Sequence, residues 1–226
     1  MSHLQFIILT LVAFVSTKVS GQYGRSRDGI PLTWSVYDYP DPHSPNADDQ
    51  RRCGRYNISS ICDPNGVISR TAADAIENLI NAVYRETTCG CFDCHKNKHG
   101  YIIRVALMHK FERIFKDEPN TSYANLRDAQ MYSYILTQRW KMEGACNETL
   151  LILFSRADSL LYTLTRQGTK MKLKNDDVQR ISLAVRHYFD KQDTIADGLM
   201  EMIRRYRLIF DNKYPEAFQP VSGKRV

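Results

Sequence analysis

Six cysteines constrain what this chain of 226 residues can fold into more than any other feature. Three of them, together with two histidines, lie within the eleven residues from Cys89 to His99. Thiolate and imidazole groups bind zinc, so Cys89, Cys91, Cys94 and His99 form a candidate four-ligand set. The same cysteines are equally suited to disulfides. The cellular compartment decides between the two, because disulfides persist outside the cell.

The first 21 residues predict a secretory signal peptide. The run from Phe6 to Val15 is apolar except for Thr10, which is too short for a transmembrane helix of ~20 residues and suits a signal-peptide core. Small or acceptable residues at 19–21 place the expected cleavage site before Gln22. No later run predicts a membrane span. We therefore expect a secreted, extracellular protein without a transmembrane span of its own.

In a secreted chain an even number of cysteines favours complete pairing. We expect one disulfide between Cys53 and Cys62, one from the cluster to Cys146, and one within the cluster. Cys91 or Cys94 is the expected partner of Cys146, because each precedes a strand and parallel strands begin at the same edge of a sheet.

Three sequons agree with the extracellular prediction. They begin at Asn57, Asn120 and Asn147, and none has proline in the middle position. All three fall in segments that we expect to be loops, where glycans can be added.

The charge pattern bears on possible partners. The chain has 31 Lys and Arg and 25 Asp and Glu, a formal net charge of +6. Basic and acidic residues are mixed, and there is no basic stripe with interleaved aromatic residues. We therefore expect no nucleic acid partner.

The hydrophobic periodicity predicts an α/β fold. Behind the signal peptide we expect an extended arm over 22–60, rich in Pro, Asp, Arg and Ser, a domain over 61–212 and a polar tail over 213–226. We expect helices in the domain over 70–87, 123–142, from 175 onward and over 195–209, and we expect Gly144 to end the second helix. The expected strands are 101–108, 149–154 and 159–165. This order predicts a three-layer αβα sandwich with a small, mostly parallel mixed sheet, the last strand antiparallel. Disulfides are expected to stabilise it.

Catalytic motifs are absent from the sequence. His109 follows the first long strand, where α/β folds place ligands. Asp63, Asp158 and the acids at 117 and 118 are candidate calcium ligands. The alternative is that Asp63 and Asp158 are turn residues. We assign no catalytic residue and no cofactor.

Several motifs resemble a known family in their order and spacing. They are "LTWSVYDYPDPHS", "CGRYNISSICDPNGVIS", "GYIIRVALM" and "CNETLLILFSRADSLLYTLT". Together they resemble the TPM domain, in the animal branch named for the modulator of the levamisole receptor. This resemblance implies an α/β sandwich and an extracellular accessory protein that increases gating of a nicotinic acetylcholine receptor channel. Plant relatives are described as acid phosphatases and some bacterial relatives bind calcium. The animal prototype has a C-terminal membrane span, which we do not find here.

Two functions follow as hypotheses. The first is a secreted, non-enzymatic binding protein that modulates a cell-surface receptor, such as a nicotinic acetylcholine-type channel. The alternative is a calcium-binding phosphate-ester hydrolase similar to acid phosphatases. The first is favoured because the sequence offers no pair of nucleophile and base.

Overall fold

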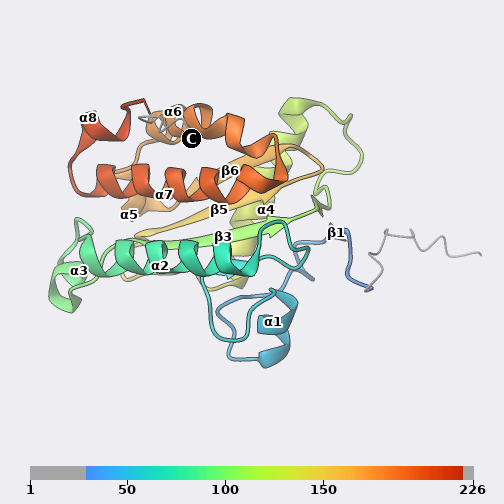
Figure 1. The fold of residues 1–226 in the computed structure, drawn as a ribbon, viewed down its shortest axis with the longest axis horizontal. Coiled ribbons are helices and arrows are strands. Elements are labelled where there is room, and N and C mark those ends of the chain that lie inside the picture. Colours follow the sequence, from blue (N-terminus) through green and yellow to red (C-terminus); the bar gives the residue numbers. More distant parts are fainter. Residues whose placement is uncertain (1–28, 221–226) are drawn as a thin grey trace, which may run out of the picture.

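A four-stranded sheet lies between two layers of helices in the computed structural model, which describes residues 29–220 (Figure 1). The predicted signal peptide and its cleavage site lie outside the described residues. The three-layer α/β architecture expected from the sequence is confirmed. No helix in the range 29–220 combines the length and the apolar character that a bilayer crossing requires.

The sheet has the strand order β2-β3-β5-β6. β2 (Ile61–Cys62), β3 (Ile102–Met108) and β5 (Thr149–Ser155) are parallel, and β6 (Leu160–Thr165) runs antiparallel to β5. The apolar runs of β3 and β5 are buried on both faces of the sheet, as expected for strands covered by helices on both sides. The predicted mixed, mostly parallel sheet is therefore confirmed.

The first helical layer consists of α2 (Arg70–Glu86), α6 (Asn175–Val185) and α7 (Ile195–Phe210). Figure 1 shows α2 and α7 side by side on one face of the sheet. Ser69 caps α2 as expected, since its hydroxyl accepts a hydrogen bond from the Ala72 N–H at 3.2 Å. The apolar faces of these helices pack on alternate residues of β3 and β5 in one core cluster.

The opposite layer contains α4 (Ser122–Arg139) and much of the segment before residue 60. Here the structure differs from the expected surface arm, because Trp34, Val36 and Tyr39 are at most 2% exposed. Within this segment β1 (Thr33–Trp34) pairs in parallel with β4 (Lys110–Phe111), and α1 (Ala47–Arg52) follows. The prolines remove any period from the sequence, yet Trp34 and Tyr39 between them bury against α4.

Short elements complete the described chain: α3 (Phe92–Asn97), α5 (Gln167–Lys170), η1 (Arg186–Phe189), η2 (Gln192–Thr194) and α8 (Tyr214–Ala217). The expected polar tail thus begins with a helix, and the Ala217 carbonyl accepts a hydrogen bond from the buried Arg205 guanidinium at 3.0 Å. α4 ends at Arg139, before Gly144. Gly144 has a different role, because a Cβ atom there would clash with the Glu148 carboxylate.

Candidate functional site

Helix α4 exposes large apolar side chains on the side that faces away from the sheet. Tyr123 is 76% exposed, and Leu126, Met131 and Tyr134 are between 38% and 50% exposed. Together with the exposed Gln130, these residues form what we call the α4 surface. Exposed apolar residues that gather on one helix face are typical of sites where another molecule binds.

The spacing of residues along α4 explains this surface. Positions 123, 126, 130 and 134 recur every three or four residues and therefore share one helix face. The opposite face buries Ala129, Tyr132 and Leu136 against the sheet and the N-terminal segment. The helix is thus apolar on two sides. One side packs in the core, and the other is exposed to solvent.

A buried carboxylate fixes the N-terminal half of α4. Asp128 is fully buried and accepts hydrogen bonds from the Arg113 Nε atom at 2.7 Å and the Phe115 N–H at 2.9 Å. A third comes from the Ile114 N–H at 3.2 Å. These contacts hold the loop before the helix against it, so the surface beside Tyr123 is firmly supported.

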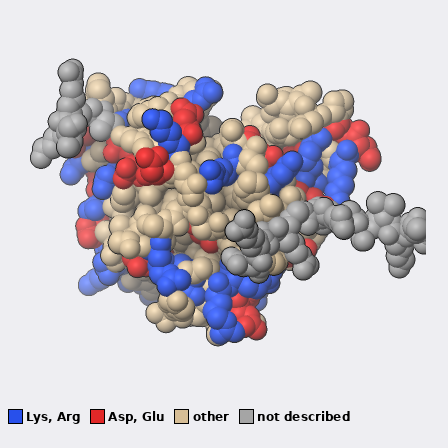
Figure 2. Space-filling view, turned by 45° about the vertical axis from the view of Figure 1, so that its right-hand side comes forward, with Lys and Arg blue, Asp and Glu red and all other residues tan. Residues whose placement is uncertain are grey.

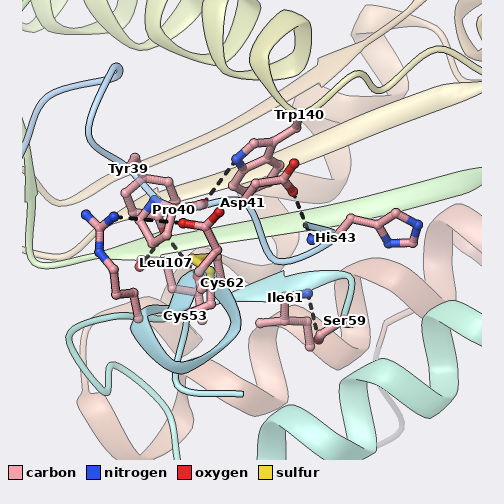
Figure 3. Close-up of a disulfide and its surroundings, with 12 residues drawn as sticks. Tyr39, Pro40, Asp41, His43, Cys53, Ser59, Ile61, Cys62, Leu107 and Trp140 are labelled. Atoms are coloured by element: carbon pink, nitrogen blue, oxygen red, sulfur yellow. Dashed lines mark hydrogen bonds and ion pairs between the residues drawn. A yellow bond between two sulfur atoms is a disulfide. The ribbon is translucent and has the colours of Figure 1, made fainter. Parts of the chain in front are cut away.

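The N-terminal segment fixes the other end of α4 (Figure 3). The Trp140 Nε1 atom donates a hydrogen bond to the Pro40 carbonyl at 3.1 Å, and its ring stacks on Tyr39 with centroids 5.9 Å apart. The Tyr39 hydroxyl reaches the carbonyls of Leu107 at 2.8 Å and Cys62 at 2.9 Å. One buried tyrosine therefore joins α4, β3 and the Cys53–Cys62 disulfide.

Two arginines border the α4 surface. Arg127 lies over the Phe115 ring with its Cζ atom 4.2 Å from the centroid, and it pairs with Glu118. Arg166 lies 6.0 Å from the centroid of the Tyr134 ring. The only acidic residue within α4 is the buried Asp128. Figure 2 shows a face on which both signs of charge are interspersed.

Asp63, a calcium candidate, is engaged by the backbone of its own turn. Its two carboxylate oxygens accept hydrogen bonds from the N–H groups of Val67 at 2.8 Å and Ile68 at 2.9 Å. Burial raises the pKa of Asp63 to about 6, although bonds from the backbone of Ile68, Val67 and Gly66 act to lower it. The carboxylate thus binds the backbone four and five residues further on, which is the role of a structural turn residue.

Asp158 and His109 lie at the ends of the strands, as expected. The Asp158 carboxylate accepts hydrogen bonds from the Ser155 hydroxyl at 2.5 Å and the Phe111 N–H at 3.4 Å. The His109 N–H donates to the Asn65 amide oxygen at 2.9 Å, which also accepts from Trp34 Nε1 at 2.8 Å. Within residues 29–220, neither Asp63 nor Asp158 belongs to a group of three potential metal ligands. Structural hydrogen bonds therefore account for these groups.

The six cysteines form the pairs Cys53–Cys62, Cys89–Cys94 and Cys91–Cys146 in the structure. The third pair joins the loops before β3 and β5, at the same edge of the sheet. The four sulfur atoms of the last two pairs all lie within 4.8 Å of one another. Cys146 thus occupies the fourth place that the sequence suggested for His99.

His99 lies in a neighbouring group with Cys94 and Glu148. Its Nδ1 atom is 3.8 Å from Glu148 Oε1, and the ring stacks on Tyr84. The Glu148 side chain is fully buried, and its Oε2 atom accepts a hydrogen bond from the Cys146 N–H at 2.8 Å. This carboxylate therefore supports the loop that carries Cys146.

The three sequon asparagines lie outside helices and strands. Asn57 and Asn120 are exposed. Asn147 is half-buried, and its amide oxygen accepts a hydrogen bond from Arg166 at 3.3 Å. The three asparagines therefore differ in how accessible their side chains are for the attachment of a glycan.

Sequence reasoning missed the α4 surface. The signal was present in the spacing of Tyr123, Leu126 and Tyr134, which lie on the helix face opposite the buried core residues. The apolar face that packs on the core is enough to predict a helix. A second apolar face does not change that prediction, so the sequence pattern did not single it out.

Comparisons with known proteins can be set beside this geometry. A family model described as modulator of levamisole receptor-1 matches residues 34–159, more than half of the chain, and agrees with the resemblance of the sequence motifs. None of the curated proteins matches the chain significantly.

Two solved structures are similar to parts of the chain. The N-terminal domain of a protein from P. gingivalis is 14% identical, with 66% of this chain and 80% of that chain covered and a TM-score of 0.46. The BA42 protein from the psychrophilic bacterium Bizionia argentinensis is 15% identical, with 65% and 83% covered and a TM-score of 0.44.

Proposed function

Because the chain belongs to the modulator of levamisole receptor-1 family, we propose that it is a secreted accessory protein that binds and modulates a cell-surface receptor. The receptor class that we propose is a nicotinic acetylcholine-type ligand-gated channel. The family description supports the receptor-modulating role. The apolar N-terminal segment and the paired cysteines support an extracellular location.

The α4 surface is the observation that carries the proposed mode of action, which is binding by contact. Tyr123 and Tyr134 are aromatic anchors of the kind that dominate protein interfaces. They sit on a helix that is fixed at both ends, so little conformational entropy is lost when a partner binds. The arginines at its border favour a partner surface that combines apolar side chains with acidic ones.

The hydrolase alternative would require an activated nucleophile, charge to stabilise the transferred phosphoryl group and usually a metal ion. The two carboxylates considered for that role, those of Asp63 and Asp158, already accept hydrogen bonds from their own turns. Our proposal therefore gives them structural roles and assigns no catalytic residue.

The test is electrical recording from cells that express a nicotinic acetylcholine-type channel, with and without the purified protein. We expect the protein to increase the agonist-evoked current. The double variant Tyr123→Ala/Tyr134→Ala should require at least about tenfold more protein for the same effect, because two interface aromatics are lost. The control Phe92→Ala/Met171→Ala removes two apolar side chains that are at least as exposed and lie outside α4, and it should act like the wild type.

Two results would count against the proposal. Equal potency of the two double variants would show that the α4 surface does not bind the receptor. Turnover of a chromogenic phosphate ester that follows the protein through purification, and that Asp158→Asn abolishes without unfolding the chain, would favour the hydrolase instead.

A further inference from the structure

A cavity of about 470 Å³ opens between the β5–β6 hairpin and the end of α6, away from the residues of the α4 surface. Its apolar lining comes from Phe154, Leu161, Leu183, Phe189 and Ile195. The Phe154 and Phe189 rings pack together with their centroids 5.0 Å apart. Volumes of roughly 300–1,000 Å³ with an apolar lining and a few polar groups are typical of small-molecule sites.

Two arginines border this cavity and come from different elements. Arg156 lies in the turn of the hairpin, and Arg186 follows the last residue of α6. Both are exposed. Among the described residues, neither guanidinium group has a hydrogen bond, ion pair or aromatic ring as a partner. This distinguishes them from Arg127 and Arg166, which contact aromatic rings of the fold.

The remaining polar lining is mostly uncharged. Gln179, Ser182 and Gln192 are amides and a hydroxyl, and Asp190 is the single acidic residue. Two guanidinium groups and one carboxylate therefore line the cavity, which gives its lining one net positive charge.

We propose that this cavity binds a small amphipathic anion. The apolar body of the ligand packs on Phe154 and Phe189, and its carboxylate, sulfonate or phosphate accepts hydrogen bonds from Arg156 and Arg186. Guanidinium groups are suited to this role because their planar N–H donors match the oxygens of such anions. An uncharged ligand would gain no ion pair from either arginine, and hydrogen bonds to neutral acceptors are weaker. This proposal does not depend on the receptor proposal, and most of the cavity lining follows residue 159, outside the segment that the family model matches.

Two fluorescent probes of nearly the same size distinguish the contribution of the arginines to binding from the contribution of the apolar lining. One is 1-anilinonaphthalene-8-sulfonate, and the other is N-phenyl-1-naphthylamine, which lacks the sulfonate. We expect the folded wild-type protein to bind one equivalent of the sulfonate and to bind the uncharged probe at least about tenfold more weakly, because a charge-assisted hydrogen bond is lost.

Substitutions in the cavity lining test whether the probes bind in this cavity. Arg156→Gln/Arg186→Gln should weaken sulfonate binding at least about tenfold and leave the affinity for the uncharged probe unchanged. The matched control Arg70→Gln/Arg85→Gln removes two charges from α2 and should bind like the wild type. Gln179→Trp places a large side chain at the cavity and should weaken both probes. Near-ultraviolet circular dichroism monitors the fold, so that binding to partly unfolded protein is recognised.

Displacement of the bound sulfonate by decanoate or by decyl phosphate distinguishes carboxylate from phosphate ligands, and either result supports the shared chemistry. The proposal is overturned if the native protein does not bind the sulfonate. It is equally overturned if sulfonate binding is the same in the wild type and in the natively folded Arg156→Gln/Arg186→Gln variant.

Discussion

An aspartate such as Asp63 can either stabilise a turn or bind a metal ion, and the sequence alone allowed both roles. In the structure it is 8% exposed, and its oxygens are occupied by backbone N–H groups. A carboxylate in this position costs free energy by desolvation, which its hydrogen bonds only partly offset. The residue therefore couples the stability of the fold to pH.

We predict that Asp63 makes the protein less stable as the pH rises from 4 to 7. Its pKa is about 6 in the folded chain, against 3.8 for an ordinary Asp. The folded state holds the proton more tightly, so the stabilising contribution is complete below pH ~4 and is lost as the pH rises through 6. This difference corresponds to about 3 kcal/mol.

Urea unfolding of the wild type and of Asp63→Asn across this range measures the effect. The free energy of unfolding should fall more steeply with pH in the wild type than in the variant. Parallel pH profiles would show that Asp63 does not titrate in this window.

The sequon asparagines allow a second prediction at the scale of single residues. Asn57 and Asn120 are exposed, whereas Asn147 is half-buried and contacts Arg166. We expect glycans at Asn57 and Asn120 but not at Asn147. In material from secreting cells, Asn57→Gln and Asn120→Gln should each remove one glycan from the intact mass, and Asn147→Gln should remove none. Three glycans on the wild type would contradict this.

At the scale of elements, α4 is held by a segment that lies almost 100 residues earlier in the sequence. Tyr39 and Trp140 pack together, and both make buried hydrogen bonds to backbone carbonyls. Because these contacts also touch β3 and the Cys53–Cys62 disulfide, the N-terminal segment is part of the second core and supports the α4 surface from behind.

We predict that Tyr39→Phe lowers the free energy of unfolding by about 1–3 kcal/mol, because two buried carbonyls lose their hydroxyl partner. Tyr37→Phe is the matched control. Tyr37 lies two residues away and is 68% exposed, so its variant should stay within about 0.5 kcal/mol of the wild type. Urea unfolding followed by tryptophan fluorescence compares the two variants. Equal stability would show that the hydrogen bonds of the Tyr39 hydroxyl to β2 and β3 do not stabilise the fold.

At the scale of the whole molecule, the disulfides differ in how much chain they close. Cys91–Cys146 spans 55 residues and joins the loops before two neighbouring strands. Cys53–Cys62 spans only 9 residues. Longer closed loops restrict the unfolded chain more, so the third disulfide should contribute most to stability.

Loop-closure entropy predicts that Cys91→Ser/Cys146→Ser costs about 4 kcal/mol and Cys53→Ser/Cys62→Ser about 2.5 kcal/mol. Urea unfolding without reductant measures both. The intact wild-type protein should gain about six hydrogens in mass on reduction, in agreement with three disulfides. Free thiols together with stoichiometric zinc in the native protein would instead support a tetrathiolate site made by Cys89, Cys91, Cys94 and Cys146.

The sequence by itself determined the elements that carry a regular pattern. The apolar runs of β3 and β5 and the Ser69 cap of α2 are local signals, because strand and helix periods depend on near neighbours. The order of these elements then permits few topologies, so the three-layer sandwich followed as well. The range that the family model matches, 34–159, contains these segments.

Only the tertiary structure decided the placement of residues without a period. Trp34 and Tyr39 lie among prolines and polar residues, and their burial depends on α4, which is distant in sequence. The same holds for the choice of Cys91 over Cys94 as the partner of Cys146, and for Arg156 and Arg186, which line one cavity although they come from different elements. Side chains from separate segments converge only when the core closes, because contacts between distant residues form through packing rather than through local backbone preference.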